Sequence, residues 1–187
     1  MGHRRKLCKR HDEPGDAHYL TFSCHRRLPL LRSPTACRVL AESIERARQK
    51  HGFWLWGYVF MPEHAHLLLM PTSPASRVSK ILMDIKRPVA MQAISRLRDR
   101  RSAVLERLRV PGRGGSQYRF WQAGGGYDRN INSTQAVRET LDYMHHNPVR
   151  RGLVDRADEW EWSSARAWAG LPGQPLVIDR NMPVVSA

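Results

Sequence analysis

The sequence predicts an α+β fold: a ferredoxin-like two-layer sandwich, in which a central antiparallel sheet has its helices packed mainly on one face. Strand-like and helix-like segments follow the order strand, helix, strand, strand, helix, strand, which is the split βαβ pattern. The second and third strands are separated by only a short turn, which predicts a hairpin. The 187 residues, 41% hydrophobic and 26% charged, suffice for one domain with one core.

The first half of the chain carries the clearest local signals. HYLTFSC (18–24) alternates apolar and polar residues and predicts a strand. A helix is predicted over 33–52, because apolar residues keep helical spacing between Ser33-Pro34 and Gly52. FWLWGYVF (53–60) and HAHLLLMP (64–71) are predicted as strands joined by the turn at MPEH.

The second half is more basic and richer in glycine. A long helical region is predicted from about Pro74 to Arg109, interrupted at Pro88. After a glycine-rich loop (111–116), QYRFWQ (117–122) predicts the fourth strand, and AGGGYDRNI (123–131) a flexible bend.

A last helix is predicted over about 133–147, where Asn132 and Gln135 resemble a capping box and Pro148 stops the helix. The tryptophans of WEWSSARAW (160–168) are expected to pack back on the body. The predicted organisation is a flexible basic arm at 1–17, a single domain at 18–170 and a loose tail at 171–187.

Charge indicates the partner. The 31 Lys and Arg residues exceed the 17 Asp and Glu residues, for a net charge of +14, and most of the cations are arginine. Arginine suits bidentate contact with phosphate, so a polyanion is expected, and nucleic acid is the commonest one. No apolar stretch approaches the roughly 20 residues that span a bilayer, so no membrane association is expected.

Two histidines stand out in MPEHAHLLL. Successive strand side chains point to opposite faces, so His64 and His66 share one face while Ala65, Leu67 and Leu69 share the other. The apolar face can pack on helices, which leaves both imidazoles free to hold a metal ion or a phosphate. Two ordinary surface histidines are the alternative for the pair taken alone.

A second group of residues lies in LDYMHHNPV. Tyr143 and Asn147 are four residues apart and share a helix face. A tyrosine can attack phosphorus to give a covalent phosphotyrosine, although its free pKa of about 10 means that it needs a nearby cation. A half-buried packing role is the alternative for this tyrosine alone.

These segments resemble a known family. MPEHAHLLL resembles the HUH motif (His, hydrophobic, His) of single-tyrosine transposases, and YMHHNPVRRGLV resembles their nucleophile helix. RFWQAGGGYDRNI and WEWSSARAW are similar to further signatures of the REP-associated tyrosine transposases. The resemblance runs from about His18 to Trp168 and implies the HUH endonuclease type of sandwich.

The resemblance also implies a mechanism. His64, His66 and Asn147 would bind a divalent metal, Mg²⁺ or Mn²⁺, although imidazole usually favours softer metals such as zinc. Tyr143 would attack single-stranded DNA beside a hairpin, such as a REP-like palindrome, and leave a 5′-phosphotyrosine and a free 3′-hydroxyl. Insertion-sequence relatives usually carry glutamine where Asn147 stands, so asparagine favours the REP-associated branch.

DNA contacts are expected from the basic region and its neighbours. Ten basic side chains between Lys80 and Arg113 can follow a phosphate backbone. Phe120, Trp121 or Tyr127 are candidates for stacking on bases, with core packing as the alternative for the first two. The residues expected to contact DNA are Lys86, Arg87, Arg119, Phe120, Trp121 and Arg150. The expected protein is cytoplasmic and nucleoid-associated, and more readily a monomer than a dimer.

Two other functions fit part of the pattern. A domesticated transposase would bind DNA hairpins without cutting them, and intact motif residues argue against that without excluding it. A histidine-triad nucleotide hydrolase needs a third histidine where this chain has Leu68, and it leaves Tyr143 without a role.

Overall fold

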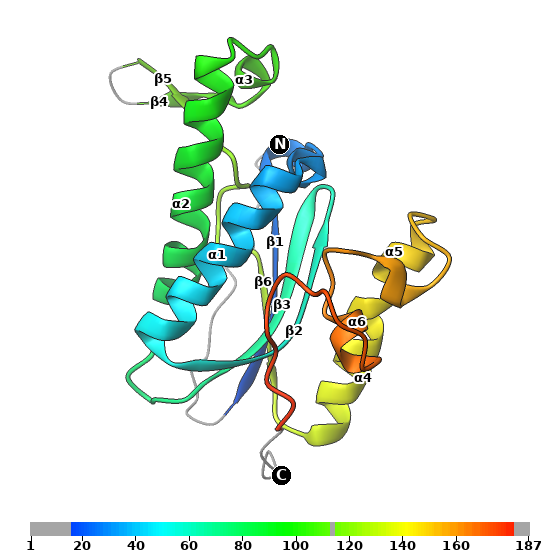
Figure 1. Cartoon of the computed structure of the whole chain (residues 1–187). Coiled ribbons are helices and arrows are strands. Elements are labelled where there is room, and N and C mark those ends of the chain that lie inside the picture. The colour runs from blue at the N-terminus through cyan, green and yellow to red at the C-terminus, as the bar shows by residue number, and fades with distance from the viewer. Residues whose placement is uncertain (1–15, 113–114, 182–187) are drawn as a thin grey trace, which may run out of the picture.

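The computed structural model describes residues 16–112 and 115–181, and its centre is a four-stranded antiparallel sheet with the strand order β2-β3-β1-β6 (Figure 1). The strands are β1 (Ala17–Ser23), β2 (Phe53–Met61), β3 (His64–Pro71) and β6 (Tyr127–Ile131). In this order β3 lies between β1 and β2, as the split βαβ pattern predicts. The α+β sandwich predicted from the sequence is therefore confirmed.

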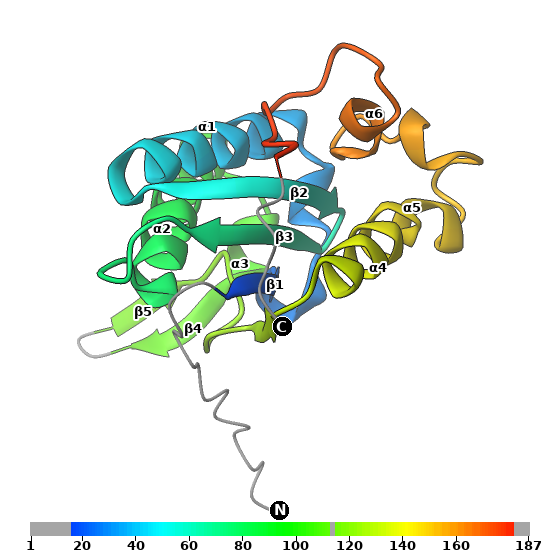
Figure 2. The same cartoon turned by 90° about the horizontal axis from the view of Figure 1, so that it is seen from below.

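The two longest helices cover one face of this sheet, as expected. They are α1 (Pro34–His51) and α2 (Val78–Asp99), which pack against each other and against the sheet (Figure 2). Leu67, Leu69 and Ala65 belong to the core on this side, in agreement with the alternation of β3. The helix α1 begins at the N-cap Ser33 and ends at Gly52, whose φ of 64° favours glycine.

A shorter helix, α4 (Thr134–His145), lies on the opposite face. Its residues Val137, Leu141 and Met144 form a second core cluster with side chains of the sheet. The helix approaches closely because β2 carries Gly57, where an added Cβ would stand 2.5 Å from Leu141 Cδ2. The histidine face of β3 is therefore the face that α4 borders.

The fourth strand of the sheet is misplaced in the sequence prediction. Residues 117–122 were expected to form it, but the structure places β6 at Tyr127–Ile131, within the segment expected to be a bend. The polar residues of β6 hid its identity, because they are paired: Asp128 accepts a hydrogen bond from buried His18, and Asn130 donates one to Asp16. Residues 117 and 118 belong instead to a separate hairpin of β4 (Arg109–Gly112) and β5 (Gly115–Tyr118).

The predicted interruption at Pro88 is also wrong. The helix α2 continues through Pro88, and the short helix α3 (Val104–Arg107) follows it. Buried residues lie on both sides of the proline, at Ile81, Ile85 and Val89, and pack in the same core. The burial of this continuous stripe outweighs the loss of one helical hydrogen bond.

The start and end of the last long helix differ slightly from the prediction. Ser133, and not Asn132, caps α4, since its hydroxyl accepts the N–H of Ala136 at 3.2 Å. The chain then enters the short helix α5 (Asn147–Arg150), with Pro148 in its first turn. Backbone N–H groups of a first turn have no acceptor within the helix, so the missing N–H of proline costs no hydrogen bond there.

The C-terminal part is anchored to the sheet. Trp160 and Trp168 donate indole hydrogen bonds to Phe60 O and Trp56 O of β2, and the second of these residues ends α6 (Ala165–Trp168), so the tryptophans pack back as expected. Three short 3-10 helices, at His25–Arg27, Leu30–Arg32 and Ala157–Glu159, complete the described elements.

The segment after Gly170 is not loose as far as it is described. Leu176 and Ile178 are buried, and the Asp179 carboxylate accepts hydrogen bonds from Arg48 and from the backbone N–H of Leu55. The expected arm at 1–17 lies outside the described residues except at its end, where Ala17 begins β1. Within the described ranges no helix has the length and apolar character needed to cross a membrane.

Gly126 is the glycine whose replacement we expect to cost most. Its φ is +74°, and an added Cβ would stand 2.2 Å from the backbone oxygen of Thr21. We expect Gly126→Ala to lower the free energy of unfolding by about 2–4 kcal/mol in urea denaturation. Gly124 is the control, because its φ of +102° is strained but no atom lies near the added Cβ. An equal cost at both positions would contradict a role for the close approach to β1.

Candidate functional site

A pocket of about 600 Å³ lies on the face of the sheet that α4 borders. Strands β1, β3 and β6 form its floor, and α4 forms one wall. Its lining includes Tyr19, Thr21, Arg27, His64, His66, Tyr127, Arg129, Tyr143 and Asn147. The sequence-predicted tyrosine, histidines and asparagine therefore meet in one cavity, although up to 83 residues separate them in the chain.

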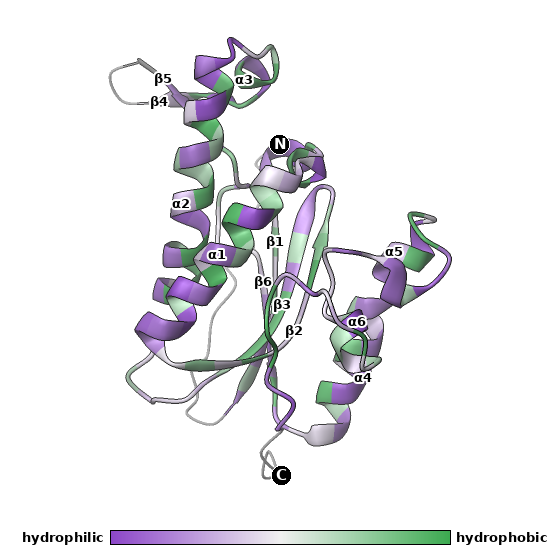
Figure 3. Cartoon of the chain, in the orientation of Figure 1, coloured by the Kyte–Doolittle hydropathy of each residue, from purple (hydrophilic) through white to green (hydrophobic). Residues whose placement is uncertain are grey.

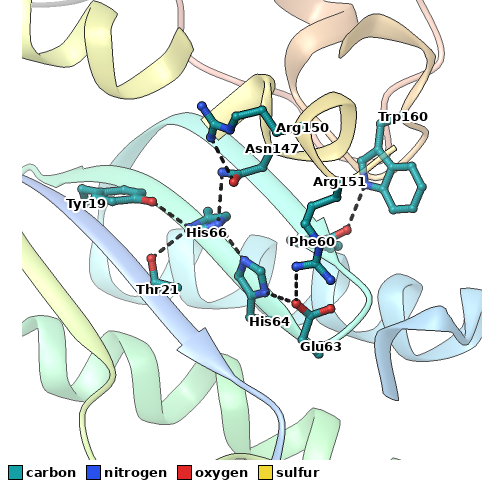
Figure 4. Close-up of polar contacts among 10 residues, drawn as sticks. All are labelled: Tyr19, Thr21, Phe60, Glu63, His64, His66, Asn147, Arg150, Arg151 and Trp160. Carbon is teal, nitrogen blue, oxygen red and sulfur yellow. Dashed lines mark hydrogen bonds and ion pairs between the residues drawn. The ribbon is translucent and has the colours of Figure 1, made fainter. Parts of the chain in front are cut away.

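The two histidines converge from β3. Their Nε2 atoms lie 2.9 Å apart, and their rings are perpendicular with centroids at 4.6 Å (Figure 4). His66 is 5% exposed, whereas His64 is only partly buried and borders the open part of the pocket. Alternation along the strand produces this arrangement, since Ala65 between them points into the opposite core.

Both imidazoles are held in their neutral form. Burial lowers the pKa of His66 to about 3, and the neighbouring His64 and Arg150 add to this effect. Burial also lowers the pKa of His64, although the Glu63 carboxylate partly opposes the shift. A neutral imidazole keeps a lone pair on one ring nitrogen, which is the form that binds metals.

Two hydroxyls on β1 support His66 from behind. Its Nδ1 lies 2.9 Å from both the Tyr19 hydroxyl and the Thr21 hydroxyl (Figure 4). A hydroxyl can donate or accept, so Nδ1 keeps a partner whichever ring nitrogen carries the proton. His66 can therefore turn an Nε2 lone pair into the pocket without leaving Nδ1 unpaired. Burial raises the pKa of Tyr19 to about 12, against the Thr21 hydrogen bond, and keeps its proton in place.

A buried carboxylate supports His64 in the same way. The Nδ1 of His64 donates to Glu63 Oε1 at 3.1 Å, and Arg151 donates to the same oxygen at 2.8 Å. Burial alone would raise the pKa of Glu63, but the hydrogen bond and charge of Arg151, together with His64, hold it below its usual value. With its Nδ1 proton fixed on Glu63, His64 presents the Nε2 lone pair to the pocket.

Asn147 and Arg150 connect the tyrosine helix to the histidines. The Asn147 amide lies with Nδ2 3.4 Å from His66 Nε2 and donates to Tyr143 O at 3.2 Å. Arg150 donates to Tyr143 O at 2.8 Å and to Asn147 Oδ1 at 3.0 Å. The turn between α4 and α5 thus places the asparagine side chain beside the histidine pair.

Tyr143 lines the pocket with a side chain that is open to a ligand. It is 51% exposed, and the Arg150 guanidinium lies over its ring, 4.4 Å from the centroid. Its ring centroid is 6.4 Å from that of Tyr19, which in turn stacks on His66 at 5.6 Å. Tyr127, also 51% exposed, lies across the pocket and contacts Tyr19 edge-on.

The donor set is suited to one cation with open positions. Two neutral Nε2 atoms converge, and a half-turn of the Asn147 amide would replace Nδ2 by an oxygen. The described parts of the chain contain no group of three His, Cys, Asp or Glu residues with metal-binding geometry. With the histidine pair, the amide oxygen would complete a set of three protein ligands and leave positions for a substrate oxygen.

The residues expected to contact DNA are spread over several places. Arg150 lies at the site, while Arg119 and Arg87 are exposed elsewhere. Lys86 is partly buried, with Nζ 5.6 Å from the centre of the Phe22 ring, and with Arg87 it borders a shallow hollow of about 340 Å³.

The two aromatic residues in this set pack in the core. Phe120 is 2% exposed and Trp121 is 7% exposed, and the Trp121 indole donates to Lys86 O at 2.8 Å. This burial favours the alternative given for the two rings, core packing, over stacking on bases. The two rings instead fill the core between α2 and the sheet, where Trp121 contacts Phe22 of β1.

Sequence reasoning did not single out several residues that support the site. Tyr19 and Thr21 could have been found from alternation, since they face away from the core residues Leu20 and Phe22. Glu63 directly precedes His64, so a carboxylate partner was visible there. Arg151 gives no local signal, because it is 88 residues from Glu63 in the sequence and contacts it only in the folded structure.

Comparison with known proteins gives a structural match. No family model matches the chain, and neither does any curated protein. The fold is shared with a REP-associated tyrosine transposase solved in complex with a REP hairpin, at a TM-score of 0.64 and 19% identity, over 100% of this chain and 98% of that one. A provisionally named transposase from Deinococcus radiodurans R1 covers 79% of this chain and 97% of its own at 17% identity, but its TM-score of 0.43 is too low to support an argument.

Proposed function

We propose that the chain is a metal-dependent endonuclease and strand transferase of the REP-associated tyrosine transposase family. Its substrate would be single-stranded DNA next to a hairpin, and its intermediate a 5′-phosphotyrosine on Tyr143. The observation that carries this proposal is the pocket in which Tyr143 meets His64, His66 and Asn147. The shared fold supports it, because the matching transposase was solved with a hairpin bound.

The proposed reaction is a transesterification in which bonds balance. The Tyr143 oxygen loses its proton and forms a bond to phosphorus, while the bond from phosphorus to the 3′-oxygen breaks and that oxygen takes up a proton. One phosphodiester replaces another, so neither an oxidant nor ATP is needed. A 3′-hydroxyl from a second strand can reverse the step and join the strands.

The side chains around the pocket divide this task. Tyr143 is exposed and can reach a strand that enters the pocket, while the Arg150 guanidinium lies over its ring and brings positive charge to this wall. Arg27 and Arg129, at the pocket wall, suit the flanking phosphates. Tyr127 offers an open ring on which a base can stack.

His64, His66 and Asn147 would hold the divalent metal. When bound, such an ion neutralises charge that develops on the phosphate oxygens. The chain itself contributes the preset geometry: Glu63, Tyr19 and Thr21 fix the two rings, so little reorganisation is needed on binding.

A denaturing gel tests the proposal directly. A labelled hairpin with a single-stranded foot, incubated with the protein and Mn²⁺, is expected to give a covalent protein–DNA adduct and a shortened strand. Omission of the metal should abolish both products. Tight hairpin binding without adduct, whichever divalent metal is supplied, would instead support the hairpin-binding protein that does not cut.

A further inference from the structure

Among the described residues that line the pocket, Glu139 of α4 is the one with an acidic side chain. Arg27 and Arg129 line the same pocket, and the Arg150 guanidinium lies over the ring of Tyr143. A carboxylate among these cations repels the phosphates of a DNA strand, so it opposes the affinity that the arginines would supply. Glu139 therefore does not serve DNA affinity, and its candidate role is in the reaction.

Glu139 and Tyr143 share one face of α4. They are four residues apart, which is about one helical turn, and both line the pocket together with Ala136 and Thr140. Figure 3 shows hydrophobic and hydrophilic segments alternating along this helix, whose apolar residues belong to the second core cluster. Side chains of a helix point back toward its N-terminus, so a tyrosine extends over the turn that carries the residue four positions earlier.

The carboxylate of Glu139 is free to move within the pocket. Its side chain is exposed, and within the described ranges its one polar side-chain contact is a hydrogen bond that Oε1 accepts from Gln135 Nε2 at 3.0 Å. Gln135 is exposed as well, so water competes for this bond. Rotation of its side-chain bonds lets a glutamate contact the residue four positions later in a helix, which is here Tyr143.

The other groups near Tyr143 that could accept a proton are already engaged. His64 and His66 are held through Nδ1 and are the proposed ligands of the metal through Nε2. Glu63 is buried, and its Oε1 already accepts hydrogen bonds from His64 and Arg151. Glu139 is therefore the carboxylate that remains for the tyrosine.

We propose that Glu139 is the general base of the reaction and accepts the proton of the Tyr143 phenol as the phenol oxygen attacks phosphorus. The proposal rests on the function proposed above and adds a catalytic residue to it. The phenol of a free tyrosine has a pKa of about 10 and keeps its proton at neutral pH, so a base beside it accelerates its attack.

The proton stays on the glutamate while the DNA is attached. In cleavage the O–H bond of Tyr143 breaks, the proton binds the Glu139 carboxylate, the oxygen bonds to phosphorus, and the bond from phosphorus to the 3′-oxygen breaks. In joining, a 3′-hydroxyl attacks phosphorus, and the protonated glutamate returns its proton to the departing tyrosine oxygen. The 3′-oxygen exchanges its own proton with water in both steps, so the protein returns to its starting state.

Single-turnover cleavage of the labelled hairpin in Mn²⁺ tests the proposal with E139Q. Glutamine preserves the size of the side chain and its helix propensity but has no basic oxygen. The matched control is D142N, which removes the same charge from an exposed position of the same helix that lines a different hollow. Thermal unfolding checks that both variants fold.

E139Q is expected to cleave at least about a hundredfold more slowly than wild type, and D142N to stay within about twofold of it. Hairpin affinity, measured by fluorescence anisotropy, should be unchanged or higher in E139Q, because a negative charge has left the pocket. Wild-type cleavage by E139Q, or equal slowing in E139Q and D142N, would overturn the proposal.

A more acidic nucleophile distinguishes a base from a structural residue. Incorporation of 3,5-difluorotyrosine at position 143 supplies a phenol that ionises more easily, because fluorine withdraws electrons from the ring. The defect of E139Q should then shrink to less than about tenfold, since ionisation depends less on the carboxylate. A defect of the same size with both nucleophiles would indicate a structural role and overturn the proposal.

Two further results separate the base from the function on which it rests. Binding of Mn²⁺ to E139Q, measured by electron paramagnetic resonance, should equal that of wild type, and weaker binding would make the carboxylate a metal ligand instead of a base. Adduct formed equally fast by wild type and E139Q refutes the base and leaves the cleavage function standing. A wild type that forms no adduct refutes both.

Discussion

Tyr143→Phe is expected to abolish the covalent protein–DNA adduct, lowering cleavage at least about a thousandfold, while hairpin affinity stays within about twofold of wild type. The substitution removes one oxygen from a side chain that is already half exposed, so the fold should not be affected. The ring remains under the Arg150 guanidinium, which preserves the packing of the pocket wall. Denaturing gels and anisotropy with the same hairpin measure the two quantities.

Tyr127→Phe is the matched control for this experiment. Tyr127 lines the same pocket and is exposed to the same extent, but it extends from the edge strand β6 and contacts only Tyr19 among the pocket rings. Its adduct should form at a rate close to that of wild type. Adduct that persists in Tyr143→Phe and disappears in Tyr127→Phe would move the nucleophile to the other wall of the pocket.

His64→Ala is expected to lower cleavage at least about a hundredfold and to leave hairpin binding nearly unchanged. The imidazole would serve the metal, whereas the arginines around the pocket would supply the affinity. Electron paramagnetic resonance of Mn²⁺ provides a second measurement, and the variant should bind the ion more weakly. His64 is partly exposed at the open side of the pocket, so its loss leaves a smaller gap than the loss of His66 would.

His146→Ala is the control histidine. It lies three residues from Tyr143, but its ring nitrogen Nδ1 bonds the carbonyl oxygen of Asp142 in its own helix, and its side chain is exposed. Cleavage and Mn²⁺ binding should both match wild type. If His64→Ala reduced binding and cleavage by the same factor, the histidine pair would be structural and the metal proposal would fail.

Local sequence signals predicted the elements whose burial alternates cleanly. The strands β1, β2 and β3 and the helix α1 begin and end within a residue or two of their predicted limits, because Ser33-Pro34, Gly52 and the MPEH turn bound them. The convergence of His64 and His66 followed from the same alternation.

The elements that were missed depend on pairing between distant residues. YDRNI looks like a loop until Asp128 is seen to accept a hydrogen bond from buried His18, and QYRFWQ looks like a sheet strand until Phe120 and Trp121 are seen to fill the core. Helix α2 continues through Pro88 because it has buried residues before and after the proline, and because the helix packs against α1. These are tertiary effects that override local preference.

The candidate site was predicted better than its surroundings. Tyr143, Asn147 and both histidines could be named from motif and spacing, but the hydrogen bonds that orient them could not. Arg151 donates a hydrogen bond to Glu63 across a separation of 88 residues in the sequence. The hydroxyl of Tyr19 contacts His66 across a separation of 47 residues. Residue type and spacing can identify a candidate nucleophile or metal ligand. The role of a residue that orients such a group depends on tertiary contacts, which the local sequence does not reveal.

The pocket draws its tyrosine and both histidines from a single copy of the chain, and the Glu63–Arg151 ion pair ties the segment after the tyrosine helix to the residue that precedes β3. The proposed chemistry would then need no second copy of the protein. The cleavage rate per DNA-bound molecule should therefore stay the same when the protein is diluted.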